Sequence, residues 1–190
     1  MSKIFLQSFL KNPRQTGSIV PSSVFLVKKL TDPVDYEKSK ILVEFGAGNG
    51  VVTKTILRKM RDDAILVCIE IEEKLCREIK KKIKDPRLKL ICGGAGDLGD
   101  FLRELKIEQV DYIISELPLV SLPAEMVENI LISAKKYLKP DGKYIQMQYS
   151  LLGLKKLKRH FSEVKISFTP LNIPPSFVYI CSLSLSLDEC

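Results

Sequence analysis

Several features that mark common protein classes are missing from this sequence. In its 190 residues, no apolar run approaches the roughly 20 residues that a membrane-spanning helix needs. The five cysteines are odd in number, scattered and without a C-x-x-C pair, which predicts neither a disulfide framework nor a zinc site. We therefore expect a protein of a reducing cytoplasm, without a metal, that is soluble or at most peripheral on the cytoplasmic membrane.

Histidine is nearly absent, and the charge is unbalanced. The only histidine, His160, lies in the basic run KKLKRHF, which predicts a solvated helix end and no catalytic role. The chain has 30 basic and 23 acidic residues, and the net charge of +7 favours an anionic partner, either nucleic acid or a membrane surface.

The first 30 residues carry a one-sided charge, because they contain five basic residues and no acid. Apolar residues recur beside those charges at helical spacing, at Phe5, Leu6, Phe9 and Leu10. This pattern is typical of a helix that lies in the plane of an anionic membrane, and equally of a helix that caps the folded core. Both interpretations stay open at this point.

Short β-branched runs alternate with longer helical patterns from residue 39 onward. Strands are predicted at 40–45, 64–71, 88–93, 110–115, 142–150, 164–171 and 177–185, and helices at 51–62, 73–85, 98–106, 124–138 and 152–161. This order indicates an α/β fold with a doubly wound, mostly parallel seven-stranded sheet and a closing antiparallel hairpin. We expect one domain over residues 1–190, with a helical N-terminal segment (1–38) before the α/β core (39–190).

A glycine-rich loop follows the first predicted strand, in the stretch ILVEFGAGNGVV. Its glycines, Gly46, Gly48 and Gly50, have the spacing G-x-G-x-G, whereas a dinucleotide fingerprint has G-x-G-x-x-G and a P-loop ends in Gly-Lys-Ser/Thr. Val51 stands where the third glycine of the dinucleotide motif belongs. Glu44, just before the loop, would repel a phosphate and attract a cation. The loop therefore predicts a positively charged, phosphate-free ligand, S-adenosylmethionine (SAM).

Two further acids follow the next two predicted strands. Glu70 lies about 20 residues past the loop, where a carboxylate accepts hydrogen bonds from ribose hydroxyls. Asp97 follows the third strand, where it could accept a hydrogen bond from an adenine amine. Because the carboxyl ends of parallel strands meet at one edge of the sheet, Glu44, Glu70 and Asp97 are predicted to form one SAM pocket.

With these motifs in order, the sequence resembles the class I SAM-dependent methyltransferases, which have a Rossmann-like fold. It is similar in particular to bacterial phospholipid N-methyltransferases, which methylate phosphatidylethanolamine or related amino lipids, in the segments FLKNPRQTGSIVPSS, SELPLVSLP, IQMQYS and NIPPSFVYI. The resemblance extends from about Phe5 to Ile180. It implies an enzyme with SAM as cofactor, an amino lipid as substrate and an anionic membrane surface as partner. It also implies cofactor contacts from Thr16, Gly17, Ser18, Ile19, Ala47, Ile71, Gly96, Leu98, Ser115 and Leu117.

The segment SELPL falls where amino methyltransferases hold the acceptor nitrogen. Glu116 is predicted to pair with an ammonium head group and help remove its proton, and Tyr149 to offer its ring face to the same cation. Base methyltransferases have an Asn or Asp, a Pro and an aromatic residue there, whereas this sequence has Glu116 and no aromatic. Glu116 also departs from the small residue that we expect in the lipid enzymes. Both residues also have a purely structural interpretation. SELPL is then only a strand end that turns at Pro118, and Tyr149 is an ordinary strand tyrosine.

Three functions are compatible with these patterns. The first is an N-methyltransferase that acts on an amino-phospholipid head group at a membrane surface. The second is a methyltransferase of RNA, similar to the adenine dimethylases, or of another small molecule, and the basic charge favours RNA. The third is a binding module that keeps the SAM fold without methyl transfer.

Overall fold

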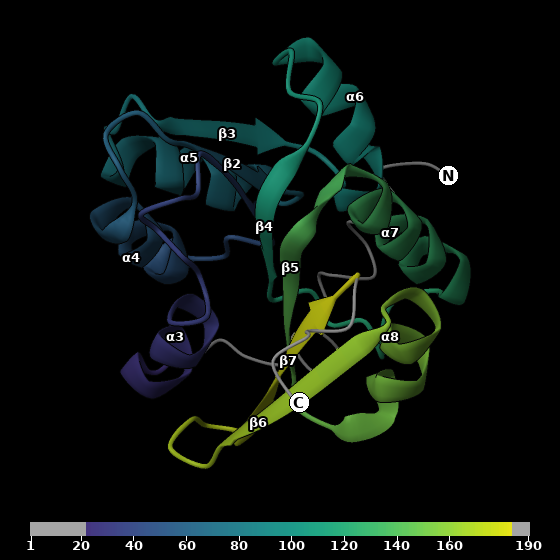
Figure 1. Cartoon of the computed structure of the whole chain (residues 1–190). Helices are drawn as coiled ribbons and strands as arrows, with labels where there is room; N and C mark the ends of the chain where they lie inside the picture. The colour runs from purple at the N-terminus through teal and green to yellow at the C-terminus, as the bar shows by residue number, and fades with distance from the viewer. Residues whose placement is uncertain (1–21, 184–190) are drawn as a thin grey trace.

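The computed structural model describes residues 22–183, and within them seven strands form a single sheet in the order β3-β2-β1-β4-β5-β7-β6 (Figure 1). Five strands run parallel: β1 (Ile41–Phe45), β2 (Ile65–Glu70), β3 (Leu88–Cys92), β4 (Val110–Ser115) and β5 (Leu138–Gln148). β7 (Ser176–Ser182) pairs antiparallel with both β5 and β6 (Glu163–Thr169). The predicted doubly wound sheet with its closing antiparallel hairpin is confirmed.

Helices cover both faces of this sheet. One face carries α3 (Val24–Thr31), α4 (Val51–Lys59) and α5 (Glu73–Lys82). The other carries α6 (Leu98–Glu104), α7 (Ala124–Tyr137) and α8 (Leu154–His160), and two short 3-10 helices, η1 (Ala95–Asp97) and η2 (Leu151–Gly153), precede α6 and α8. Figure 1 shows α3 to α5 on the left of the sheet and α6 to α8 on the right.

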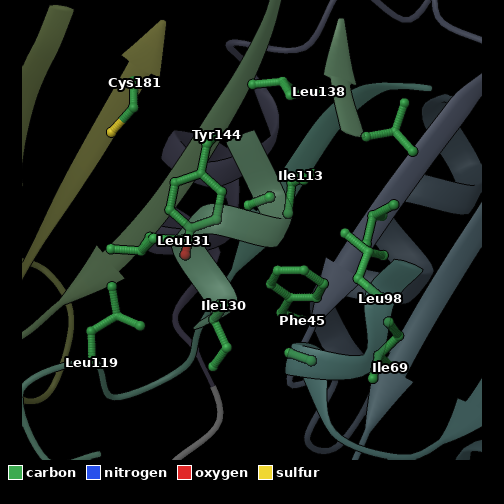
Figure 2. Close-up of a cluster of buried hydrophobic side chains, with 14 of the residues drawn as sticks. Phe45, Ile69, Leu98, Ile113, Leu119, Ile130, Leu131, Leu138, Tyr144 and Cys181 are labelled. Carbon is green, nitrogen blue, oxygen red and sulfur yellow. The ribbon is translucent and has the colours of Figure 1, made fainter. Parts of the chain in front are cut away.

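The larger hydrophobic core lies between the sheet and α6, α7 and α8 (Figure 2). Phe45, Ile69 and Ile113 enter it from neighbouring strands, and Leu131 enters it from α7. The central strands are apolar along nearly their whole length because a parallel sheet that is covered on both faces has no solvated side. This rigid layer fixes the positions of the loops at the strand ends.

The carboxyl edge of the sheet is divided into two halves between β1 and β4. The chain winds from β1 through β2 to β3 on one side of that boundary, and then returns to β4 and β5 on the other. Doubly wound folds bind their ligands at such a reversal, outside the strand ends. β6 ends at the same edge as β5, because both run antiparallel to β7. The loops after β1, β2 and β3 form the first half of this edge, and those after β4, β5 and β6 form the second.

Two expectations about single residues are wrong. Cys76 of α5 and Cys92 at the end of β3 form a disulfide with a Cα–Cα distance of 6.1 Å, because the crossover from β2 brings the start of α5 beside the end of β3. Their separation of 16 residues gives no local motif. His160 is not solvated: its side chain is only 10% exposed, and its Nε2 lies 3.2 Å from Glu128 Oε1 of α7. His160 of α8 therefore lies against α7.

None of the helices between residues 22 and 183 is long and apolar enough to span a membrane. The predicted segment 1–38 contains α3, and its first 21 residues lie outside the described part of the chain. The predicted element order is otherwise as expected, except that β5 starts at Leu138, four residues before the predicted strand at 142.

Candidate active site

The glycine loop after β1 has a backbone that only glycine adopts without strain. Gly46, Gly48 and Gly50 have φ values of +76°, +54° and +79°, in the left-handed region. A Cβ on Gly46 would lie 3.1 Å from Leu117 Cδ2, and one on Gly50 would lie 3.2 Å from Ile83 Cδ1. A Cβ on Gly48 would meet no atom within 4 Å. The loop is therefore packed against the protein at both ends and open at Gly48, where a ligand can approach the backbone.

Glu70, the last residue of β2, holds this loop in place. Its Oε2 accepts a hydrogen bond from Gly48 N at 2.9 Å, and its Oε1 accepts one from Glu72 N at 2.9 Å. Burial raises the pKa of the Glu70 carboxyl, and the two N–H groups partly offset that rise. Each carboxylate oxygen has a second lone pair, so Glu70 can still accept from the two hydroxyls of a ribose.

Glu44 is buried one residue before the end of β1. Its Oε2 accepts a hydrogen bond from Thr53 Oγ1 of α4 at 2.7 Å, its Oε1 has no hydrogen-bond partner of normal geometry, and the Cys68 thiol of β2 lies close enough to lower the pKa of the carboxyl. Burial raises the pKa of Glu44 to about 8, and the negative charges of Glu116 and Glu70 add to that rise. A buried carboxylate oxygen without a hydrogen-bond partner is costly. A cation bound beside the loop would remove that cost by stabilising the charged carboxylate.

The third acid, Asp97, lies beyond β3 at the end of η1. Its side chain is exposed and does not cap α6, so its oxygens face solvent. Gly96 beside it is also exposed, and a Cβ there would meet no atom within 4 Å. Ile71 is half-buried at the end of β2, whereas the side chains of Ala47 and Leu98 are packed in the hydrophobic clusters. The first half of the edge therefore offers Glu44, Glu70 and Asp97 around an open glycine backbone.

SAM fits this half of the edge. The unpartnered oxygen of Glu44 suits a sulfonium cation, Glu70 suits a ribose, and Gly48 leaves room for close approach. Among residues 22–183, no three His, Cys, Asp or Glu side chains are grouped so that they could hold a metal ion.

Glu116 stands directly after β4, at the boundary between the two halves. Its backbone N donates to Phe45 O of β1 at 3.1 Å, and its Oε2 accepts from Ser22 Oγ at 2.5 Å. Withdrawal from water raises the pKa of Glu116 to about 7, and the Ser22 hydroxyl partly offsets this rise. Glu116 is close enough to Glu44 for its charge to raise the pKa of that carboxyl. The structure thus brings Glu116 to the edge of the cofactor site.

Two glutamines that were not singled out in the sequence hold the segment after Glu116. Gln146 Nε2 and Gln148 Nε2 of β5 donate to Leu117 O at 2.9 and 2.7 Å. Ser115, fully buried, accepts from Leu117 N through its Oγ at 3.3 Å. The SELPL segment is therefore fixed by side chains of the neighbouring strand, and its backbone turn is part of the site.

Asn172 joins the N-terminal side of the site to the connection between β6 and β7. Its Oδ1 accepts from Ser23 N at 3.0 Å, and its Nδ2 donates to Pro174 O at 2.8 Å and Ser176 Oγ at 3.0 Å. The Ile173–Pro174 peptide bond is cis. All four segments that carry the family resemblance are thus connected around Glu116, since Ser22 and Ser23 belong to the first and Asn172 to the last.

The structure says less about the remaining predicted site residues. Tyr149, just after β5, is half-buried and packs against the hydrophobic cluster beneath α3 and α4. Thr16, Gly17, Ser18 and Ile19, which we expected to cover the cofactor, lie outside the described residues. Their contacts with SAM stay a prediction.

The sheet reverses its strand order between β1 and β4, and acids surround the open glycine loop beside that reversal. These features define the class I SAM-dependent methyltransferases. More particularly, the chain belongs to the methyltransferase small domain family, whose model matches residues 16–169. It is an enzyme of that class, and its cofactor is SAM.

Individual relatives agree with this assignment. The chain is 29% identical over 180 residues to an ornithine lipid N-methyltransferase of Singulisphaera acidiphila, and the match covers 94% of each protein. It is 28% identical over 113 residues to ribosomal RNA small subunit methyltransferase A of Mycoplasma capricolum, covering 57% of this chain and 40% of that one. A precorrin-6y C5,15-methyltransferase of Geobacter metallireducens shares the fold, with a TM-score of 0.70 at 14% identity over 89% of this chain and 93% of that one.

Proposed function

We propose that the protein methylates the amine nitrogen of an amino-lipid head group, such as phosphatidylethanolamine or an ornithine lipid, at the cytoplasmic surface of a membrane. Glu116 carries this proposal, because its carboxyl lies beside the cofactor half of the edge and has a pKa of about 7. The similarity to an ornithine lipid N-methyltransferase over nearly the whole of both chains supports a lipid acceptor.

An amine acceptor must lose a proton before it can react. A lipid head group arrives as an ammonium cation, and the Glu116 carboxylate can pair with it, orient it and accept its proton. Glu44, Glu70 and the backbone at Gly48 would hold SAM, which would supply a methyl group activated by the sulfonium charge and would leave as the neutral thioether S-adenosylhomocysteine. The role of Glu116 is to hold the deprotonated amine in position to receive that methyl group. A carboxyl with a pKa near neutral is well matched to this proton transfer.

RNA is the competing acceptor, because the chain is also similar to part of an rRNA methyltransferase. A planar base is usually held by stacking on an aromatic ring. At the corresponding position, Leu119 is fully buried in the core and offers no ring to stack on. A flexible amine needs no such ring, and this favours the lipid over the base.

The test is transfer of labelled methyl from SAM to amino lipids in mixed micelles. We expect label in phosphatidylethanolamine or ornithine lipid, at a rate that rises with pH as the amine deprotonates. Glu116→Gln should lower the rate by about 100-fold or more, while SAM affinity measured by calorimetry stays near that of the wild type. Glu104→Gln, an exposed glutamate of α6, is the matched control and should behave as the wild type.

Full activity in Glu116→Gln would show that SELPL is only a structural strand end. It would not contradict the lipid as acceptor. Label that enters RNA but no amino lipid would contradict the lipid acceptor and favour the RNA enzyme. SAM binding with no transfer to either acceptor would instead favour a binding module.

A further inference from the structure

The large apolar side chains that are exposed gather at one edge of the molecule. Of the ten such side chains in residues 22–183, seven belong to the start of α3 or to the loops after β4, β5 and β6. We call these seven the apolar rim: Val24, Phe25, Val120, Leu151, Leu152, Leu171 and Ile173. Leu152 and Ile173 are each 75% exposed. They are not buried by the part of the chain that the structure describes, residues 22–183.

One part of the apolar rim combines the start of α3 with the connection between β6 and β7. Ser23, which precedes Val24, donates its N–H to Asn172 Oδ1 at 3.0 Å. Asn172 lies between Leu171 and Ile173, so this hydrogen bond joins the two segments that carry these exposed side chains. Figure 1 shows the β6–β7 connection just below α3.

The other part combines the loops after β4 and β5, and Glu116 lies between the two parts. Glu116 begins the loop that carries Val120, and a Cβ on Gly153 would lie 3.8 Å from Val120 Cγ2. Val120 is therefore next to the turn that carries Leu152. On its other side, Glu116 accepts the hydrogen bond from Ser22, which leads into α3. The apolar rim thus borders the proposed acceptor site.

The stretch of chain that carries Leu151 and Leu152 of the apolar rim is basic. Residues 142–162 include Lys143, Lys155, Lys156, Lys158 and Arg159 and contain no acid. Lys155, Lys158 and Arg159 are exposed on α8, directly after the exposed Leu151 and Leu152. Apolar side chains beside basic ones are the pattern of a surface that inserts into a bilayer of anionic lipid.

We propose that the apolar rim inserts into an anionic phospholipid bilayer and that the basic residues of α8 contact its phosphates. This inference rests on the proposed function and extends it, because it identifies the surface that meets the membrane. The second half of the carboxyl edge then faces the bilayer. A head-group amine reaches Glu116 from the membrane surface while its acyl chains stay in the lipid.

Tryptophan fluorescence can test the orientation directly, because the sequence contains no tryptophan. Leu152→Trp and Ile173→Trp each place a single fluorophore on the apolar rim of the full chain. Ile132→Trp, on α7, is the matched control, since Ile132 is also an exposed apolar residue but does not belong to the apolar rim. Each variant is mixed with vesicles of phosphatidylglycerol and phosphatidylcholine, with and without brominated acyl chains.

We expect a blue shift and quenching by brominated lipid at positions 152 and 173, and neither change at 132. The fluorescence readout does not depend on methyl transfer, so its result tests the membrane orientation independently of the proposed reaction. Solvent-exposed emission at 152 and 173 in vesicle-bound protein would overturn the proposal. A blue shift that appears without vesicles and grows with protein concentration would also overturn it, because the rim would then bind a second copy.

Charge provides an independent measurement. The double substitution of Lys155 and Lys158 by Gln should weaken binding to anionic vesicles by about tenfold or more and reduce its dependence on salt. The same double substitution at Lys80 and Lys81, exposed on α5, is the control and should change binding much less. Equal losses from the two pairs would contradict docking through α8.

Discussion

SAM binding should release a proton from Glu44. Its Oε1 has no hydrogen-bond partner in the buried site and burial raises its pKa to about 8, so at pH 7 the carboxyl is mostly protonated. If the bound sulfonium draws Glu44 into its charged form, binding at pH 7 releases most of one proton, and it is weaker by roughly 1 kcal/mol than binding to a carboxyl that is already charged. SAM affinity should therefore rise with pH, by up to about tenfold per unit below pH 8. S-adenosylhomocysteine, which lacks the positive charge, should not show this slope.

Calorimetry in buffers with different ionisation enthalpies measures the number of protons released. Glu44→Gln is the matched variant, because an amide oxygen can still accept the Thr53 hydrogen bond but cannot titrate. The variant should release fewer protons than the wild type on binding SAM, and the two should be alike on binding S-adenosylhomocysteine. Equal release by wild type and variant would refute the placement of Glu44 beside the sulfonium.

Three further predictions follow from the same half of the edge. Burial raises the pKa of Glu44 from 4.5 to about 8, so the stability contributed by its protonated form is complete below about pH 4.5 and is lost as the pH rises through about 8. The melting temperature without SAM should therefore fall between about pH 4.5 and 8 in the wild type, and less in Glu44→Gln. Glu70→Ala should lower SAM affinity by at least about tenfold in calorimetry, since it removes a charge-assisted acceptor of about 1.5–3 kcal/mol; unchanged affinity in a folded variant would exclude Glu70 from the site. Gly50→Ala should lower the free energy of unfolding by about 1–2 kcal/mol in urea denaturation, because its φ is +79° and Ile83 lies in the way; equal stability would contradict the loop geometry.

Patterns within one stretch of chain predicted the fold well. β4 has the predicted bounds, 110–115, because an apolar run between polar flanks marks both of its ends. The start of β5 was missed because Lys139 to Gly142 has the composition of a turn, whereas Leu138 pairs with Val110 of β4 in the structure. Pairing with a distant strand outweighed the local turn signal there.

The two sides of the site differ in how far sequence could predict them. Glu44 and Glu70 could be predicted as site residues from the sequence because each lies at or near the end of a strand, beside or just beyond a glycine motif. The partners around Glu116 were missed because their contacts are remote in sequence: Ser22 is 94 residues from Glu116, and Ser23 is 149 residues from Asn172. No periodicity or local motif records such contacts, and only the family resemblance pointed to those segments.

The central claim, methyl transfer to an amino lipid, is tested most directly in a cell. The full chain is expressed in a bacterial host whose lipids include phosphatidylethanolamine but no methylated derivative, and the extracted lipids are analysed by mass spectrometry. We predict new lipids in which one or more methyl groups have been added to the head-group nitrogen, present with the wild type and nearly absent with Glu116→Gln. If phosphatidylethanolamine is not the acceptor, the same experiment in a host that makes ornithine lipid should give its N-methylated form. Unmodified amino lipids in both hosts, with the protein folded and able to bind SAM, would contradict the account.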